Sequence, residues 1–267
     1  MINFQKIIKY FAIAFAMFLI VSIISGIIYG LSTVGIIFTN SNNITSDMKA
    51  TSINSDIKSL EIDINSSDLT IKSGDMLTIE TNNSDINIIE EAELLSIKEK
   101  KNNILSTKNS KLIITLPDKI YNTLAINIGA GKVNIEKINA NSGTIELGAG
   151  NIVIDDIIIE KSLNLENGAG DLNIRNGIIN NLDLSIGAGS VTLKSKVLGN
   201  SKLDCGVGKV NLDLIGTKED YTLKISKGVG TITVADEKVK EDYNYGTGIN
   251  SIVIDGGVGK VKVNFSE

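Results

Sequence analysis

The side chains that most often carry chemistry are scarce in this sequence. Its 267 residues include no histidine and a single cysteine, Cys205. Histidine is the commonest general base, so nothing of the usual kind is available to activate a cysteine or serine nucleophile. Serine, aspartate and lysine are plentiful, but no spacing singles out a Ser–Lys pair or a carboxylate dyad. We therefore predict no catalytic residues and no enzyme.

Three acidic segments are candidates for binding a divalent cation. The first, Asn167–Asp171, is similar to a calcium-binding Gly-Asp repeat, but such sites need an aspartate in successive turns. The positions that align with Asp171 hold lysine, asparagine, serine or threonine. Asp155-Asp156 and the Glu90–Glu93 run could also touch a cation, although solvated surface charge explains both more simply. We predict no metal and no cofactor.

A glycine motif recurs through the second half of the chain. Gly-Ala-Gly or Gly-Val-Gly occurs seven times, and the first glycines are 19, 20, 19, 19, 22 and 29 residues apart: 129–131, 148–150, 168–170, 187–189, 206–208, 228–230 and 257–259. A dinucleotide-binding fingerprint needs a third glycine and a following helix. Here a strand-like pattern follows each copy, so we interpret the motif as structural.

The residues around each motif predict strands. The second and fourth residues after the last glycine are apolar in all seven copies, as is the third residue before the first glycine. Mostly polar residues alternate with them, which is the pattern of a half-buried strand. Each copy is too short to bury its apolar face alone, whereas stacked copies bury a continuous core. The sequence therefore predicts an all-β fold, a β-solenoid of 19–20-residue Gly-x-Gly rungs.

Glycine fits a corner between two strands, where the backbone takes conformations that other residues avoid. The middle residue of the motif is alanine four times and valine three times. We interpret these small apolar residues as corner packing. Cys205 stands one residue before a motif and aligns with Ile128, Leu147 and Ile186. This alignment predicts a thiol packed at a corner.

The N-terminal segment is of another kind. Lys6 and Lys9 are followed by no charge until Asp47, and residues 11–37 are dominated by Ile, Phe, Ala, Leu and Val. About 20 apolar residues span a bilayer as a helix. A signal peptide has a shorter apolar region and an A-x-A-like cleavage site, which is absent here. We predict one uncleaved transmembrane helix, with the N-terminus inside and the remainder outside the cytoplasm at the cell membrane.

The predicted organisation has four parts. Residues 1–38 form the cytoplasmic tip and transmembrane anchor, and residues 39–52 form a polar tether. Residues 53–120 contain weaker alternation and are expected to form degenerate or capping repeats. Residues 121–267 are expected to form the regular solenoid.

Several segments together resemble a known family. They are the Ser-Ser-Asp-Leu-Thr-Ile stretch from Ser66, the Ile-Thr-Leu-Pro stretch from Ile114, and the recurring Gly-x-Gly followed by alternating apolar residues. In this order they resemble the bacterial β-strand-repeat "putative adhesin" family, a domain of unknown function, over residues 53–265. The resemblance implies an extracytoplasmic β-repeat domain and supplies no catalytic residues.

Two functions remain open from the sequence. One is an adhesin or envelope-surface binding module, and the other is a regulatory ectodomain that senses envelope stress through a membrane partner. The net charge of −5, with both signs interspersed, argues against nucleic acid as a partner. An envelope polymer or a membrane protein is the expected partner. Tyr221, Tyr243 and Tyr245 are the candidate contacts, although they could instead close an irregular rung.

Overall fold

The computed structural model describes residues 44–53, 55–100, 110–226, 228–240 and 242–266. These residues belong to one compact unit. Apart from the short 3-10 turn η1 (Lys218–Asp220), its regular elements are strands: β1 Ile44–Ile53, β2 Ser59–Ile64, β3 Asp68–Gly74, β4 Leu77–Asn83, β5 Ile86–Glu91, β6 Leu94–Glu99, β7 Lys111–Pro117, β8 Ile120–Ile174, β9 Gly177–Asn180, β10 Leu182–Leu198, β11 Asn200–Ile215, β12 Tyr221–Ser226, β13 Val229–Val234, β14 Glu237–Val239, β15 Tyr243–Tyr245, β16 Asn250–Asp255 and β17 Val258–Ser266.

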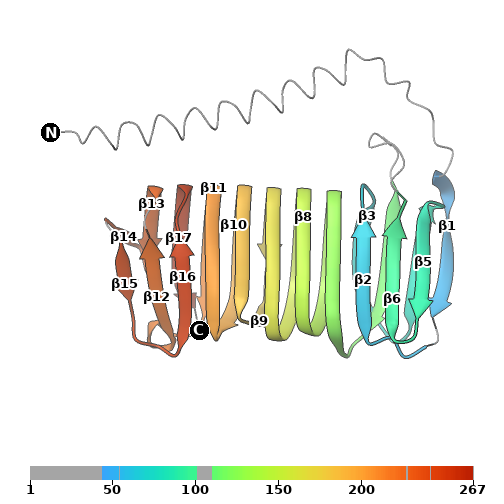
Figure 1. Cartoon of the computed structure of the whole chain (residues 1–267), viewed down its shortest axis with the longest axis horizontal. Coiled ribbons are helices and arrows are strands. Elements are labelled where there is room, and N and C mark those ends of the chain that lie inside the picture. The colour runs from blue at the N-terminus through green and yellow to red at the C-terminus, as the bar shows by residue number, and fades with distance from the viewer. Residues whose placement is uncertain (1–43, 54, 101–109, 227, 241, 267) are drawn as a thin grey trace, which may run out of the picture. The chain divides into compact units, whose positions relative to one another are not determined.

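The central rungs, residues 123–215, stack in parallel in the order of the sequence. The extended chain runs through each Gly-x-Gly corner without a break, so β8 alone contains three of them. Equivalent residues of successive rungs pair directly: Leu184 lies between Leu165 and Leu203, and Val191 lies between Leu172 and Val210. The 19–20-residue repeat is thus one rung, and the predicted all-β stack of rungs is confirmed (Figure 1).

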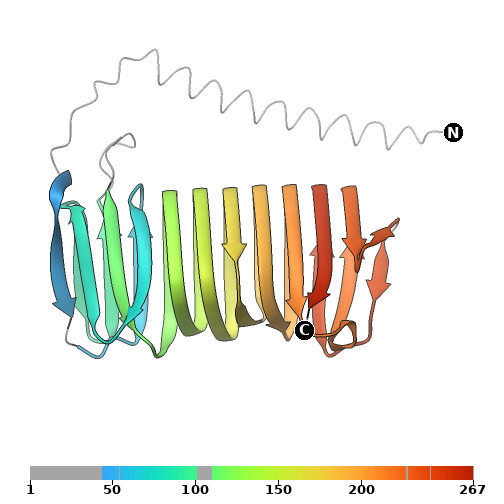
Figure 2. The same cartoon turned by 180° about the vertical axis from the view of Figure 1, so that it is seen from behind.

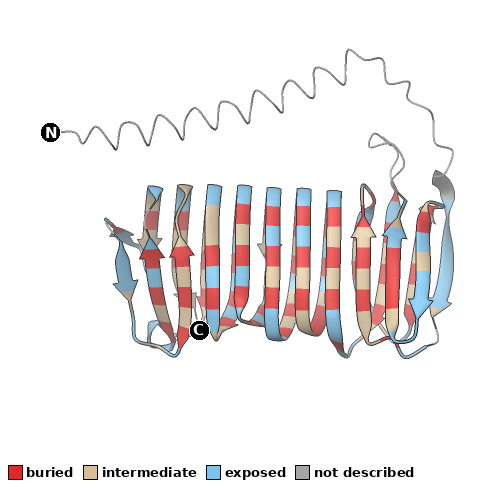
Figure 3. Ribbon diagram, viewed as in Figure 1, coloured by how far each residue is buried: buried red, intermediate tan, exposed pale blue. Residues whose placement is uncertain are grey.

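The core lies between the strand before each corner and the strand after it. All three apolar positions of every copy are buried, including those before the corner: Ile126, Ile145, Leu165, Leu184, Leu203, Ile225 and Ile254. Figure 3 shows the resulting bands, in which buried positions alternate with exposed or half-buried ones along each strand. The alternation therefore marks inside and outside as the sequence predicts.

Two columns of glycine run along the corners. A Cβ at Gly150 would overlap the carbonyl oxygen of Gly131, and one at Gly170 would overlap that of Gly150. Both residues also have a left-handed φ, of +131° and +140°. The backbones of adjacent rungs approach too closely here for any side chain, which explains why each copy keeps its second glycine.

A short third segment closes most central rungs. Ile157–Ile159, Gly177–Ile179 and Lys196–Leu198 stack on one another in parallel, away from the glycine corners. Ile157, Ile159, Ile179 and Val197 from these segments are buried. The core is therefore enclosed by three runs of strand in these rungs.

At the N-terminal end the stacking order departs from the sequence. β2 and β3 pair in parallel with β8 on one side and with β6 and β7 on the other. Chain segment 59–74 thus lies between β6 and β7 on one side and residues 123–135 of β8 on the other. β5 pairs antiparallel with β6, β4 pairs antiparallel with β7, and β1 pairs antiparallel with β4 (Figures 1 and 2).

The C-terminal end has the same kind of exchange. β16 and β17 lie between β11 and the pair β12 and β13, all in parallel. β14 and β15 then pair antiparallel with the outermost strands β13 and β12. The chain therefore reaches the outer rung of β12 and β13 first and returns to insert β16 and β17 beneath it. The 29-residue spacing between the last two glycine motifs reflects this detour.

Residues 44–52, which the sequence predicts to be part of a polar tether, lie in β1. This strand pairs with β4 at Ile44 and again from Lys49 to Ile53, with an irregularity between them. The predicted anchor, residues 1–38, lies outside the described residues. Among the residues that the structure describes, no helix has the length and apolar character needed to cross a bilayer.

Candidate functional site

The C-terminal end carries a cap of two short strands. After β13 the chain turns through Ala235 and Asp236, whose φ values of 48° and 64° are left-handed as a tight hairpin requires. β14 follows antiparallel to β13, and β15 continues antiparallel to β12. This cap positions Tyr243 and Tyr245 on the last strand of the stack.

The three predicted tyrosines belong to one aromatic cluster that Phe265 joins together. The Tyr243 and Tyr245 rings are 6.2 Å apart, and Tyr245 stacks on Phe265 at 5.7 Å and 15°. The Tyr221 ring is also close to Phe265, with centroids 5.8 Å apart. Phe265 is not among the residues predicted from the sequence. It stands two residues after Val263, so the alternation along β17 was the signal that could have found it.

The members of this cluster differ in exposure. Tyr221 is fully buried, and its hydroxyl donates a hydrogen bond to the Ile215 carbonyl at 2.8 Å. Burial raises the pKa of the Tyr221 hydroxyl. Tyr245 is half-buried against the core, whereas Tyr243 is 43% exposed and the nearby Ile249 is 91% exposed. Tyr221 therefore supports the cap from inside, and Tyr243 presents an aromatic surface to solvent.

A shallow polar depression of about 650 Å³ is lined in part by Phe265. Asp213, Glu219 and Asp236 contribute carboxylates to its lining, and Lys218 contributes an ammonium group. Asp236 also forms an ion pair with Lys262 at 2.9 Å. The surface around the cluster thus combines aromatic and polar groups, which is the usual composition of a recognition site.

A second open groove, of about 680 Å³, follows the glycine corners of the central rungs. Its wall is a column of outward residues, one from each rung: Glu146, Glu166, Ser185, Asp204 and Asp255. The middle residues of the glycine motifs form the ridge beside it. Most are exposed, with Val207 at 42% and Val229 at 43%, so the interpretation of these residues as corner packing is wrong. Only the glycines make the close contact between rungs.

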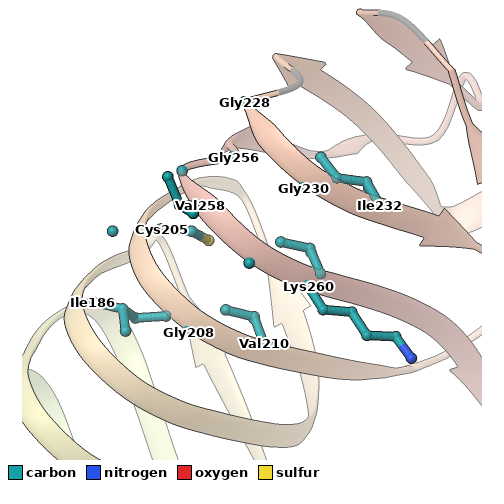
Figure 4. Close-up of a pocket in the computed structure, with 14 residues that line it drawn as sticks. Ile186, Cys205, Gly208, Val210, Gly228, Gly230, Ile232, Gly256, Val258 and Lys260 are labelled. Carbon is teal, nitrogen blue, oxygen red and sulfur yellow. The ribbon is translucent and has the colours of Figure 1, made fainter. Parts of the chain in front are cut away.

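Cys205 is half-buried and packs against the core at its corner, in agreement with the sequence prediction. It lies beside a cavity of about 10 Å³, shown in Figure 4, where Gly256 follows Cys205 in the inward column. Burial, with a smaller effect of the Asp204 and Asp255 charges, raises the pKa of the thiol to about 11. A thiol with so high a pKa is largely protonated at neutral pH and is a poor nucleophile.

The three acidic candidates for a cation have protein partners. Asp155 pairs with Arg175 at 2.6 Å, and Asp156 accepts a hydrogen bond from Asn176 at 2.8 Å. Asp171 accepts one from the Ser190 hydroxyl, and Glu93 pairs with Lys58. Within the described part of the chain, no three Cys, Asp or Glu residues come together in a geometry that could hold a metal ion.

Comparison with known proteins identifies relatives of this chain. A family model described as "Toastrack DUF4097" matches residues 57–251. No curated protein matches the chain.

Solved bacterial structures are similar over most of the chain. A "putative cell adhesion protein" from Clostridium sporogenes ATCC 15579 is 13% identical and covers 82% of this chain and 99% of its own, with a TM-score of 0.33. A "putative adhesin" from Bacteroides fragilis NCTC 9343 is 16% identical and covers 82% and 98%, with a TM-score of 0.37. One from Parabacteroides distasonis ATCC 8503 is 11% identical and covers 82% and 96%, with a TM-score of 0.31.

Proposed function

This chain belongs to the Toastrack DUF4097 family, as its sequence predicts, and from that premise we propose that it is a membrane-anchored binding module of the cell envelope. In this proposal residues 1–38 anchor the protein, residues 44–266 lie outside the cytoplasm, and the C-terminal end binds an envelope or surface component.

The exposed Tyr243 at the C-terminal end carries this proposal. Among the residues with described side chains, Tyr243 is the only aromatic one classed as exposed. Its ring is held in place through Tyr245 and Phe265, so binding would order few additional side-chain torsions. Aromatic rings on a rigid support present an apolar face, and neighbouring polar groups can fix a ligand's orientation. A polymer with alternating apolar and hydroxylated faces, such as a glycan, matches this surface.

The proposal is tested with the intact protein and purified envelope polysaccharide. We expect Tyr243→Ala to weaken binding at least fivefold, because it removes the exposed ring and leaves the buried Tyr221 in place. Asn244→Ala is the matched control, since Asn244 is an exposed neighbour on the same strand. Equal affinities for the two variants would reject Tyr243 as the binding surface.

A regulatory ectodomain is the second candidate, and the position of β1 favours it. β1 begins at Ile44, so only residues 39–43 separate it from the predicted anchor. Five extended residues span at most about 18 Å, which would keep an anchored domain near its own membrane. Such a short link suits contact with a membrane protein better than long-range adhesion.

Crosslinking in the native membrane separates these two functions. Recovery of a membrane protein, crosslinked to wild type and absent with Tyr243→Ala, would support regulation through the C-terminal end. Recovery of wall or host polymer would support adhesion.

A further inference from the structure

The corner between β2 and β3 differs from the Gly-x-Gly corners of the stack. Asn65-Ser66-Ser67 occupies the place of a Gly-x-Gly motif: Gly129 lies against the Asn65 carbonyl, and Gly131 lies against the Ser67 carbonyl. The glycine columns therefore end on this corner. Glycine is needed where the carbonyl oxygens of the preceding rung press against a corner. The outer side of the Asn65-Ser66-Ser67 corner meets a side chain instead.

The corner's backbone N–H groups face the side chain of Glu99. In the next rung the Ala130 N–H donates to the Asn65 carbonyl at 2.9 Å, so corner N–H groups point toward the N-terminal end of the stack. At Asn65-Ser66-Ser67 the corresponding acceptor is Glu99, the last residue of β6. One carboxylate thus takes the role that backbone carbonyls have in the central rungs.

The donors converge on both oxygens of this carboxylate. Oε2 accepts from the backbone N–H groups of Asn65 at 2.8 Å, Ser66 at 2.9 Å and Ser67 at 3.3 Å. Oε1 accepts from the Ser67 hydroxyl at 2.9 Å and the Asn83 amide at 2.9 Å. The Asn65 amide also donates to the Glu99 carbonyl at 3.0 Å.

The site is built from buried groups and has one exposed side. Ser67 is 0% exposed and Asn83 is 5% exposed, and the Ser67 hydroxyl also contacts the Ser110 hydroxyl, which is 3% exposed. Ser66 is exposed, so the corner can be reached from solvent. Successive backbone N–H groups form concave sites that bind anions, and their hydrogen bonds to an ionised acceptor are the strong ones.

We propose that this corner is an anion-binding site for a single carboxylate, which the chain occupies with its own Glu99. Three donors bind one oxygen and two bind the other. This pattern matches a planar carboxylate. All five donors are neutral, so a monoanion is favoured over a dianionic phosphate. Removal of the Glu99 side chain leaves a vacancy that takes a small free carboxylate such as formate or acetate.

The test is chemical rescue in the full-length chain, solubilised in detergent. Glu99→Ala leaves the buried Ser67 and Asn83 donors without their acceptor, so we expect its Tm to fall by several degrees. Formate at 100 mM should restore at least half of that loss relative to chloride at the same ionic strength. Phosphate should restore less than formate does.

Two controls separate this site from general salt effects. The wild type should not respond to formate beyond chloride, because the tethered Glu99 has a high effective concentration in its own site. Glu99→Gln retains the volume of the side chain and should likewise show no rescue. Glu91→Ala, an exposed carboxylate at the same end, should change Tm little.

The outcomes are decisive in either direction. A Glu99→Ala variant that formate and acetate stabilise no more than chloride does would overturn the proposal. The proposal would also be overturned if formate stabilised the wild type as much as it stabilises Glu99→Ala. If Glu99→Ala is recovered only as unfolded protein, the yield of refolded protein in formate is measured in place of Tm. A yield in formate no higher than the yield in chloride would also overturn the proposal. None of these results depends on the function proposed for the C-terminal end.

Discussion

The central rungs and the two ends of the stack use the same strands in different ways. In the central rungs each strand lies beside the one that follows it by 19 or 20 residues, and every pairing is parallel. At the C-terminal end the chain forms the outer rung first and then inserts β16 and β17 beneath it. At the N-terminal end the inner strands β2 and β3 come first, β6 and β7 add the outer rung, and β8 returns to the inner side. Antiparallel strands then cover the outer rung at both ends.

This difference shows how a repeating stack can be terminated. A rung of the central type would present open backbone groups to another rung, and such edges invite pairing between molecules. At the C-terminal end β14 and β15 have three residues each, too few to template a further rung. At the N-terminal end the Glu99 carboxylate satisfies the corner. The ends therefore carry the irregular sequence, while the central rungs can repeat.

The largest expected effect contrasts an inward position of the central rungs with an apolar residue at the N-terminal edge. Leu184 is 1% exposed and stacks between Leu165 and Leu203. Leu184→Asp would bury either a charge or an unpaired carboxyl, and we expect it to lower the free energy of unfolding by about 4 kcal/mol or more. Ile89→Asp should cost within about 0.5 kcal/mol, because Ile89 is 42% exposed on β5.

Urea unfolding of the chain carrying each change measures both values. Thr192→Asp is a second control, an outward site within the central rungs whose stacked neighbours, Asn173 and Asn211, are uncharged. Similar midpoints for Leu184→Asp and Ile89→Asp would mean that the central rungs tolerate disruption as well as the ends do.

The same contrast explains how far sequence could predict the fold. The inward positions such as Leu184 and Val191 follow a strict repeat, so their burial and stacking could be predicted. The exchange of segments 59–74 and 250–266 could not, because parallel pairing between rungs depends on equivalent apolar positions and not on chain order. Residues 44–52 lack a clear apolar alternation, which is why β1 was expected to be a tether.

The candidate site was predictable in the same uneven way. Tyr243 and Tyr245 stand close together in the sequence, in the longest gap between glycine motifs. Phe265 joins them only because β17 inserts beneath β12 and β13. The anion site has no sequence signal of its own, since Glu99 and Asn65 are brought together by the parallel pairing of β6 with β2.

An intermediate effect is expected from exchanging the corner residues of the two regions. Gly150 stacks against Gly131, and Gly131 stacks against Ser67, so Gly150 and Ser67 occupy the same place in their corners. Gly150→Ser puts a Cβ onto the Gly131 carbonyl at a left-handed φ of +131°, and we expect a loss of about 3 kcal/mol. Ser67→Gly removes the three hydrogen bonds of the Ser67 hydroxyl, to Glu99, Ser110 and Asn83, without steric conflict and should cost about 1–2 kcal/mol.

Urea midpoints again provide the measurement, with Ser66→Gly as the control for added backbone freedom at the exposed middle position of the corner. A Gly150→Ser variant as stable as the wild type would show that the glycine columns are not required where the rungs stack.

The smallest effect concerns the tyrosines at the two ends. Tyr121 lies just before the first central rung and is 1% exposed, with its hydroxyl donating to the Pro117 carbonyl at 3.3 Å. Tyr221 begins the outer C-terminal rung, where its hydroxyl donates to the Ile215 carbonyl. Burial raises the pKa of Tyr121 to about 12 and raises that of Tyr221. A raised pKa means that the folded state holds the phenol proton more tightly than the unfolded state does.

The stability that this provides is present below about pH 10, the ordinary pKa of tyrosine, and is lost as pH rises toward about 12. Over that range the wild type should lose stability through Tyr121. Tyr121→Phe should be less stable than the wild type at pH 8 by about 0.5–1.5 kcal/mol, because it lacks the hydrogen bond. The gap should close or reverse by pH 11.5, since phenylalanine has no proton to lose.

Unfolding curves at both pH values test this, and Tyr243→Phe at the exposed edge should follow the wild type at each. A constant gap between Tyr121→Phe and the wild type would mean that the buried phenol does not couple the N-terminal end of the stack to pH.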